Sequence, residues 1–447
     1  MSSKTYSPYW NPKTELAERW RIEKMQLYKF QKTVQFAYQN SPLWKRKLDE
    51  ASVHPDDIKT LDDVRRVPLL TKKEFLDSQE REPLYGDLLA TSTDNAINYH
   101  QTSGTSGRLP LRIVDGRRDW YWLADAWAQG LWAFGVRPND VAYFAFGYGP
   151  FIGFWISHYG FEKIGAMVVP GGGLSSEARI RQIIDLGATV VVATPTYALR
   201  LVQTAREMGI DLAKDSKVRL TVHAGEPGAS IPATKRAIEE GWGAKCGDFG
   251  GMSECGANFY FTCSHESPGV HIHEDQFLQE VINPETLEPV PMGQRGELVI
   301  TPFGRGTLPA IRYRTGDLVE RIPASECTCG RTFDMYRGGI IGRADDMKLI
   351  RGVNVYPSAI EGIVRQYREI DEFQIVVHRE GIQDEITINV DLSPTYPSEG
   401  YAALCRKLAD DLAEAHEWLR FNVVAVEPGS LPRFELKSKR LVDKRNA

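Results

Sequence analysis

The chain has 447 residues, of which 42% are hydrophobic and 25% are charged, as in ordinary soluble globular proteins. Its formal charge of −5 provides no basic field for nucleic acid, and no apolar run approaches the roughly 18 residues that a membrane span needs. The first residues, MSSKTYSPYW, lack the apolar core of a signal peptide. We therefore expect a cytoplasmic protein of about two to four domains, with no nucleic-acid or membrane partner.

The N-terminal part is predicted to be helical. Apolar residues recur every three or four positions between residues 14 and 50, and a Ser-Pro break at Ser41 divides this stretch into two helices. Thr71 and Glu74 have the spacing of a capping box, which predicts a further helix after Thr71.

From about residue 97 the pattern changes to short β-branched or aromatic runs that alternate with helical segments. Such alternation predicts a largely parallel α/β sheet whose strands end in ligand-binding loops. An almost unbroken apolar run such as VVVAT fits a strand that is buried on both faces. The predicted strands lie in NDVAYFAFGYG, GAMVVPGGG, ATVVVATPT, VRLTVHAGEPG and GAKCGDFGG.

The last part of the chain has a different pattern. Residues 278–322 read as strands punctuated by Pro and Gly, which predicts a β-rich subdomain. After a boundary between Gly342 and Asp346, the order helix, strand, strand, helix, strand predicts a small α+β domain. We therefore expect an α/β fold with a large domain at residues 1–344 and a small domain at residues 345–447.

Three loops and the C-terminus carry candidate chemistry, and each has a plainer alternative. The segment TSGTSG at residues 102–107 suits an anion nest of backbone N–H groups, although it lacks the Walker lysine and could be a simple hairpin turn. Glu254 in DFGGMSECG offers a hard oxygen ligand for Mg²⁺, or it is a solvated loop residue. Asp317 follows a Thr-Gly turn and could accept hydrogen bonds from ribose, or only cap that turn. Taken alone, the basic stretch PRFELKSKRLVDK reads as a solvated tail without chemistry.

The order of these segments is more specific than any one of them. The series TSGTSG, HAGEP, FGGMSE, YRTGDL and GRADDMKLIRG, followed by a Lys near the C-terminus, resembles the adenylate-forming superfamily, and above all the phenylacetate-CoA ligase family. The resemblance extends over nearly the whole chain, including GVHIHEDQF and RGVNVYPSAIE. It implies a large adenylate-forming domain and a small, mobile C-terminal domain that carries the catalytic lysine.

The family resemblance implies a two-step reaction. A carboxylate attacks the α-phosphate of ATP to give acyl-AMP and pyrophosphate, and the thiol of coenzyme A then displaces AMP. By position in the C-terminal motif, Lys437 would be the catalytic cation and Glu254 the Mg²⁺ ligand. The family usually has Gly before this lysine, whereas this chain has Leu436, so Lys439 remains an alternative.

The resemblance also assigns the remaining nucleotide and coenzyme A contacts. Either Ser or Thr can donate a hydroxyl to phosphate, so Ser106 in place of the family's Thr should change little. Asp345 would be the hinge, and Lys348 and Gly352 would line the coenzyme A tunnel, although Gly352 could also be a plain turn glycine. The implied contacts are Ser103, Gly104, Thr105, Ser106 and Gly107 for pyrophosphate, Glu226, Pro227, Phe249 and Gly250 for adenine, and Asp317 and Arg343 for ribose.

The acid pocket is expected along residues 143–160 and near HAGEPG. Five aromatic residues there could form a wall for an aryl ring, or they could belong to the core. Our substrate candidates are Tyr148, Phe151 and His223, with His273 as a further polar contact. The sequence does not distinguish phenylacetate from benzoate, aminobenzoates, dicarboxylated rings or indole acids. The aromatic residues are Phe146, Tyr148, Phe151, Phe154 and Trp155.

Cysteine usage indicates reduced thiols or a metal site, because the chain shows no export signal. Two thiols spaced Cys-x-Cys, with a distant Cys and His, could form a structural tetrahedral zinc site. Our ligand choice is Cys263, His271, Cys327 and Cys329, with His265 as the substitute for His271. Buried thiols without metal are the alternative.

The predicted activity is that of an AMP-forming aryl-CoA ligase that uses ATP, Mg²⁺ and coenzyme A. Two alternatives remain open: an adenylating enzyme that loads a carrier protein or stops at the adenylate, and a non-catalytic nucleotide-binding regulator. A homodimer is common in the family and is expected here, although no residue of this chain indicates it.

Overall fold

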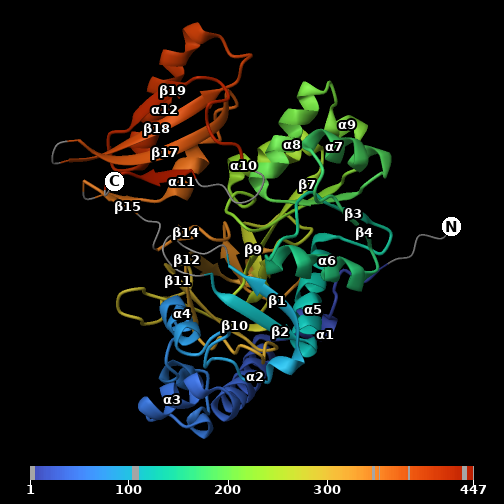
Figure 1. The fold of residues 1–447 in the computed structure, drawn as a ribbon, viewed down its shortest axis with the longest axis vertical. Coiled ribbons are helices and arrows are strands. Elements are labelled where there is room, and N and C mark those ends of the chain that lie inside the picture. The colour runs from blue at the N-terminus through green and yellow to red at the C-terminus, as the bar shows by residue number, and fades with distance from the viewer. Residues whose placement is uncertain are drawn as a thin grey trace.

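The computed structural model describes residues 6–102, 110–344, 348–351, 353–380, 383–434 and 440–445. It has an α/β fold, with a large N-terminal region built on one mixed sheet and a small C-terminal domain. Figure 1 shows the small domain, in orange and red, beside helices α8 (Pro195–Glu207) and α10 (Pro232–Trp242) of the large region. No helix among these described residues is long and apolar enough to cross a membrane.

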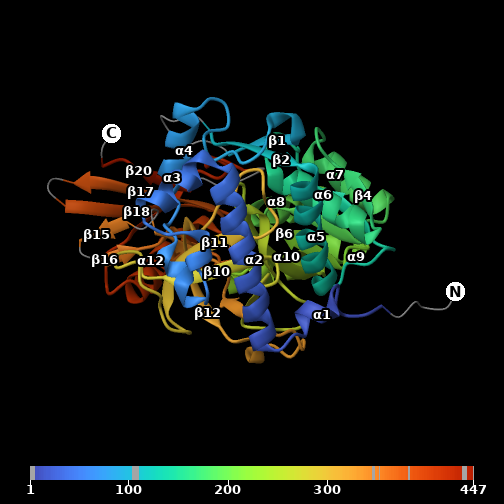
Figure 2. The same cartoon turned by 90° about the horizontal axis from the view of Figure 1, so that it is seen from below.

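The helical N-terminal region is confirmed. Ser41 accepts a hydrogen bond from the Trp44 N–H and thereby begins the second of the two predicted helices, and Thr71 and Glu74 form the predicted capping box. Figure 2 shows the longest of these helices running beside strand β10 (Phe277–Ile282), with which it is in contact. The helices are α1 (Pro12–Glu15), α2 (Arg19–Asn40), α3 (Pro42–Glu50) and α4 (Lys72–Arg81), with short 3-10 turns at Pro55–Asp57, Asp62–Arg66 and Thr93–Asn95.

The parallel half of the main sheet is also confirmed. Its strands pair in the order β7-β6-β5-β3-β4, and all four pairings are parallel. Side chains on one face pack against α5 and α6, and those on the other face pack against α7, α8 and α10. The strands are β3 (Val141–Phe144), β4 (Met167–Pro170), β5 (Val190–Ala193), β6 (Leu220–His223) and β7 (Lys245–Met252), and the remaining helices are α5 (Arg117–Phe134), α6 (Ile152–Ile164), α7 (Ser176–Asp185) and α9 (Leu212–Asp215).

The β-rich region continues the same sheet in antiparallel fashion. After β7 the order is β8-β9-β13-β12-β11-β10, and β14 pairs with β12. Strands β1 (Ala96–Gln101) and β2 (Arg112–Gly116) form a separate antiparallel pair on either side of the TSGTSG segment. The other strands are β8 (Gly256–Phe261), β9 (Gly269–Ile272), β11 (Arg295–Pro302), β12 (Tyr313–Ile322), β13 (Met335–Arg337) and β14 (Gly342–Arg343), and a 3-10 turn covers Ala324–Glu326.

The described part of the C-terminal domain has the predicted α+β content and three strands more, namely the β15-β16 pair and β20. Its main sheet has the order β19-β18-β17-β20, and its helices α11 and α12 contribute to the same core. The elements are β15 (Lys348–Ile350), β16 (Val353–Val355), α11 (Pro357–Val364), β17 (Ile370–Glu380), β18 (Gln383–Leu392), α12 (Tyr401–Ala415), β19 (Asn422–Val426) and β20 (Leu441–Asp443), with a 3-10 turn at Ser398–Gly400.

Strand β20 corrects the interpretation of the basic C-terminal stretch as a solvated tail. Leu441 pairs in parallel with Ile375 of β17, and Arg440 just before it is buried. The backbone of residues 441–443 therefore completes a sheet, and Arg440 meets acidic partners inside the protein.

Candidate active site and metal centre

The loops after β5, β6 and β7 bring candidate residues to the carboxyl edge of the parallel strands. Glu226, after β6, accepts a hydrogen bond at 3.0 Å from the backbone N–H of Thr196 in the first turn of α8. The carboxylate of Glu226 thus contacts a helix N-terminus, where negative charge is favoured. Pro227 beside it is exposed.

Glu254 is not a solvated loop residue. Its residue is 7% exposed, and one of its carboxylate oxygens lies 3.7 Å from the Lys72 Nζ at the start of α4. The carboxylate of Glu254 thus has the Lys72 amine and, as a hydrogen-bond partner, the Tyr313 hydroxyl near it. Carboxylate oxygens suit a hard cation such as Mg²⁺.

A buried ion pair supports the loop that carries Glu254. The Arg305 guanidinium donates two hydrogen bonds of 2.8 Å to the carboxylate of Asp115, and both side chains are fully buried. Arg305 also donates to the backbone carbonyls of Ser253 and Glu254, at 2.6 and 3.2 Å. This bidentate pair therefore holds the backbone on which the candidate Mg²⁺ ligand is mounted.

The two candidate ribose contacts are neighbours. Asp317 and Arg343 are paired residues of β12 and β14, and the Arg343 Nη1 lies 3.3 Å from the Asp317 Oδ1. Gly316 before Asp317 has a φ of +76°, a conformation that favours glycine and re-aims the strand. The predicted turn before Asp317 is therefore not formed: residues 313–322 are one strand, in which Gly316 lies at an irregularity of the pairing with β11.

The two adenine candidates on β7 are a buried aromatic residue and a glycine. The Phe249 ring is buried, stacked against Trp127 at 5.6 Å and edge-on to Phe134, so it packs inside the core. A Cβ at Gly250 would lie 1.9 Å from the Tyr260 ring, so only glycine fits there. A nucleotide contact at these positions would therefore involve the backbone.

The aromatic residues between β3 and α6 form one cluster. The rings of Phe146 and Phe154 lie 3.8 Å apart, and Tyr148 contacts Phe146 and Trp155 at 5.7 and 4.7 Å. The Tyr148 hydroxyl is hydrogen-bonded to His158 at 2.8 Å, and burial raises its pKa above the ordinary value. Phe151 is half-buried at the N-cap of α6. The cluster is partly core, since Phe146 is buried, and partly accessible, since Trp155 is exposed.

His223 ends β6 and is fully buried. Its Nδ1 is hydrogen-bonded to the Ala193 carbonyl at 2.9 Å, whereas its Nε2 has no hydrogen-bond partner. Burial lowers the pKa of His223 to about 4, so the ring is neutral at pH 7. A neutral ring that donates from Nδ1 presents Nε2 as an acceptor.

Several predicted site residues lie outside the described residues: Ser103, Gly104, Thr105, Ser106, Gly107, Asp345, Gly352 and Lys437, together with the alternative Lys439. Lys348 is described, and its Nζ lies 3.4 Å from the Asp443 carboxylate of the C-terminal domain. The predicted coenzyme A contact is thus in an ion pair in this arrangement.

The structure brings the four candidate metal ligands together. The ligand atoms of Cys263, His271, Cys327 and Cys329 all lie within 4.8 Å of one another, and all four residues are buried. The Cys263 and Cys327 sulfurs are 3.6 Å apart, and the Cys329 sulfur is 3.3 Å from the His271 Nε2. His265 does not belong to this group, and it is exposed.

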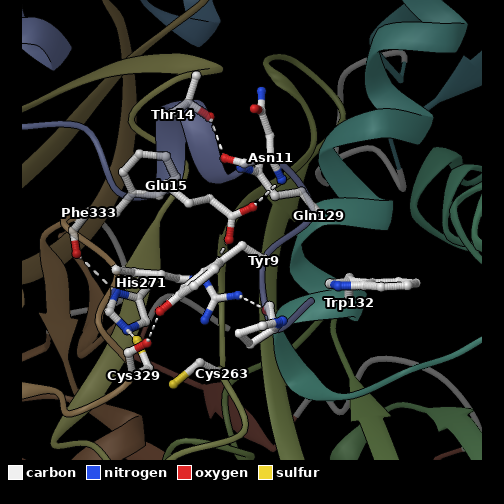
Figure 3. A network of polar contacts seen from close by, with 12 residues as sticks. Tyr9, Asn11, Thr14, Glu15, Gln129, Trp132, Cys263, His271, Cys329 and Phe333 are labelled. Carbon is white, nitrogen blue, oxygen red and sulfur yellow. Dashed lines mark hydrogen bonds and ion pairs between the residues drawn. The ribbon is translucent and has the colours of Figure 1, made fainter. Parts of the chain in front are cut away.

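The surroundings of this Cys/His cluster orient its histidine. The His271 Nδ1 is hydrogen-bonded to the Phe333 carbonyl at 2.9 Å, which leaves Nε2 facing the sulfurs, as Figure 3 shows. From the N-terminal segment, the Tyr9 hydroxyl donates to the Cys329 carbonyl at 3.0 Å. Arg331, two residues after Cys329, donates to Glu15 at 2.8 Å. The cluster therefore joins β8, β9 and the 327–333 loop to the N-terminal segment.

Sequence reasoning missed the residues that hold the loops of the candidate site in place. Asp115 follows two buried apolar residues in β2, and this signal could have indicated a buried basic partner. Arg305 and Thr196 carry no comparable signal, because their roles depend on segments distant in the chain.

Three comparisons with known proteins agree with this geometry. The AMP-binding enzyme C-terminal domain family matches residues 352–445. The phenylacetate-coenzyme A ligase of Escherichia coli (strain K12) is 34% identical over 445 residues, which cover 98% of this chain and 98% of that protein. The structure of 2-hydroxyisobutyryl-CoA ligase in the postadenylation state with 2-HIB-AMP has a TM-score of 0.94 at 31% identity, covering 100% of this chain and 94% of that one.

A second state of that neighbour shows which domain arrangement this chain has. In the thioesterification state, with 2-HIB-AMP and CoA, the TM-score is 0.74 at 32% identity, covering 98% of this chain and 93% of that one. The two scores place this chain in the arrangement of the postadenylation state. Sequence identity at this level, over nearly the full length of both chains, shows the family. The chain belongs to the phenylacetate-CoA ligase family of AMP-forming acid–thiol ligases.

Proposed function

We propose that this protein converts phenylacetate, or a closely related aryl acid, to its coenzyme A thioester by way of an acyl-adenylate, with ATP as the activating substrate. One observation carries the proposal: 34% identity to a phenylacetate-coenzyme A ligase over 98% of both chains. The resemblance to a neighbour bound to an acyl-AMP supports the adenylate intermediate.

In the first step, a carboxylate oxygen of the acid forms a bond to the α-phosphorus, and the bond to pyrophosphate breaks. Negative charge develops on the phosphate oxygens, so a positioned cation lowers the barrier. We assign that cation to Lys437 and the grip on pyrophosphate to residues 103–107, both from their motifs. Glu254 is our Mg²⁺ ligand, because its buried carboxylate suits a hard cation, and the bound ion would neutralise phosphate charge.

The nucleoside would contact the edge of the sheet beside these groups. Asp317 and Arg343 are the ribose contacts in this proposal, supported by their side-by-side positions. Adenine would lie against the loops of Glu226, Pro227 and Gly250. The proposed contact at Phe249 is made by its backbone, because its ring packs in the core.

In the second step, the coenzyme A sulfur forms a bond to the acyl carbon, AMP leaves, and the thiol proton passes to solvent or phosphate. The neighbour's two states support a domain rearrangement between the steps. We propose Asp345 as the hinge between domains 1–344 and 345–447. Lys348, here paired with Asp443, and Gly352 would line the coenzyme A tunnel after the rearrangement.

The aromatic cluster supports an aryl acid. Phe146 and Trp155 contact the Tyr148 ring, Phe154 packs on Phe146, and an aryl group would stack on such a surface. Phe151 and His223 are the further proposed contacts. The unpartnered Nε2 of His223 would accept a hydrogen bond from a polar group of the ligand.

We also propose that the Cys/His cluster holds a structural zinc ion. With Zn–S near 2.3 Å and Zn–N near 2.0–2.1 Å, tetrahedral ligand atoms are roughly 3.5 to 3.8 Å apart. The sulfur–sulfur distance of 3.6 Å and the sulfur–nitrogen distance of 3.3 Å approach these values. Four protein ligands leave no open position, so the role is structural. The expected homodimer stays a prediction.

The test is AMP release over a panel of acids, with and without coenzyme A: phenylacetate, benzoate, 2-aminobenzoate, indole-3-acetate and 2-hydroxyisobutyrate. We expect the highest kcat/KM with phenylacetate and multiple turnovers only with coenzyme A. Sustained AMP release without coenzyme A would favour an adenylating enzyme that loads another acceptor. The absence of turnover with every acid would favour a non-catalytic regulator.

A further inference from the structure

Arg440 follows the segment that contains Lys437 and is buried between acidic side chains of its own domain. Its side chain is 6% exposed. Its Nε donates to a Glu372 oxygen at 2.7 Å, and its Nη1 donates to a Glu361 oxygen at 3.2 Å. These bonds tie the start of β20 to α11 and β17.

The same guanidinium also crosses to the large domain. The Arg440 Nη2 donates to the Thr196 Oγ1 at 3.2 Å, and the Thr196 N–H donates to Glu226 at 3.0 Å. A continuous polar path therefore runs from the proposed adenine loop, through the first turn of α8, to the residue three positions after Lys437. Burial alone would lower the pKa of Arg440, but Glu361, Glu372 and Glu226 together raise it above its ordinary value.

Two other polar contacts between α8 or α10 and β17 or its preceding loop are weaker. Gln203 donates to Asp371 at 3.4 Å, near the limit for a hydrogen bond. Arg368 and Glu240 lie 3.0 Å apart, but both side chains are well exposed, and exposed ion pairs contribute little. Of these contacts among the described residues, only that of Arg440 is both charged and buried.

We propose that Arg440 is a positioning residue for adenylation: its hydrogen bond to Thr196 holds the C-terminal domain against the first turn of α8, and so against the Glu226 loop, in the arrangement seen here. This inference rests on the proposed function and on the assignment of Lys437. The neighbour's thioesterification state has a different domain arrangement, so the contact with Thr196 should serve the first half-reaction only.

The test separates the two half-reactions in the full-length enzyme. Adenylation is measured as pyrophosphate release in a single turnover with phenylacetate and ATP, and thioesterification as coenzyme A consumption with supplied phenylacetyl-AMP. Arg440→Lys keeps the charge but loses the planar fork that bonds three partners. We expect adenylation to fall roughly 10- to 100-fold, while thioesterification stays within about twofold.

Thr196→Val is the second variant, because it removes only the hydroxyl acceptor and leaves the backbone N–H that bonds Glu226. We expect adenylation to fall roughly 3- to 10-fold, with thioesterification unchanged. The double variant should resemble Arg440→Lys alone, because the same bond is already lost. The matched control is Arg368→Gln, which removes the exposed interdomain pair and should leave both half-reactions at the wild-type rate.

Equal losses in both half-reactions for Arg440→Lys would overturn the inference, because they would show that Arg440 only holds its domain together. Wild-type adenylation in Thr196→Val would also overturn it. The proposed function fails in a different way: the wild-type enzyme itself would then form neither phenylacetyl-AMP nor the thioester, and the inference would fall with it.

Discussion

The Cys/His cluster and the boundary between the two domains are built in opposite ways. The cluster is complete within one domain, with four ligand atoms inside 4.8 Å and a histidine already oriented by Phe333. The boundary has a single buried charged contact, from Arg440 to Thr196, among the contacts described above. The cluster is enclosed by one core, whereas the boundary, which in the proposed mechanism is reassembled for each half-reaction, is held by few bonds. We therefore expect changes in the cluster to affect mainly stability, and changes at the domain boundary to affect mainly turnover.

The largest expected effect is on the rate of adenylation, at the site that the domain boundary completes in the proposed mechanism. Lys437→Ala should reduce adenylation roughly 10²- to 10³-fold, because it removes the cation that we assign to the developing charge on the α-phosphate. Thioester formation from supplied phenylacetyl-AMP should continue, since that step does not need this cation. Single-turnover pyrophosphate release measures the first reaction, and coenzyme A consumption measures the second.

Lys439→Ala is the matched control for this prediction. We expect it to leave both rates near the wild-type value. If Lys439→Ala loses adenylation and Lys437→Ala does not, then the catalytic lysine has been assigned two positions too early in the chain.

The next largest effect concerns the Cys/His cluster, and it should appear as a loss of stability. Protein purified without added metal should contain about one zinc per chain by elemental analysis. Cys329→Ser should lose this zinc and lower the thermal unfolding midpoint by about 5 °C or more, because loss of a structural metal is among the few large single-site effects. Both half-reactions, measured well below that midpoint, should change much less.

Cys405→Ser, on α12 of the other domain, is the control and should retain both the zinc and the midpoint. Clearly substoichiometric zinc in the wild-type protein would reject the metal site. The four residues would then be three buried thiols and a histidine without a metal ion.

The smallest expected effect is a change in the pH dependence of stability. It concerns His223, at the edge of the sheet that faces the domain boundary. Native His223 has a pKa of about 4, below the unfolded value of 6.5, so the unfolded chain binds a proton that the native protein excludes. This contribution to stability is complete above pH 6.5 and is lost as the pH falls toward 4, by about 1.4 kcal/mol per pH unit. His223→Gln should reduce the slope of unfolding free energy against pH by up to one proton in that window.

Denaturant unfolding at several pH values measures this slope, with His54→Gln at an exposed position as the control. An unchanged slope in His223→Gln would show that His223 is protonated to the same degree in both states.

Local sequence patterns predicted the elements well, because each depends on residues close together in the chain. The Ser41 break, the Thr71 capping box and the parallel strands at the centre of the sheet are all present. Strand β20 was missed because the basic residues on either side of it suggest solvent, while its pairing with β17 depends on a partner more than sixty residues away.

The candidate site divides in the same way. Cys-x-Cys spacing with a distant Cys and His indicated a metal site from residue types alone, and the structure brings those four side chains together. Phe249 was grouped with the adenine contacts by its motif, yet its ring is directed into the core by the alternation of β7 and the packing of Trp127. A motif identifies a position along the backbone, and packing decides where the side chain points.

The sequence by itself determined the family, the order of the elements and the chemistry of the ligand atoms, because these are encoded in residue type and spacing. Only the tertiary structure decided that Glu254 is buried beside Lys72, that Arg305 supports its loop, and that Arg440 reaches Thr196 across the domain boundary. The physical reason is that burial and charge pairing depend on which distant segments pack together. No local pattern records that choice.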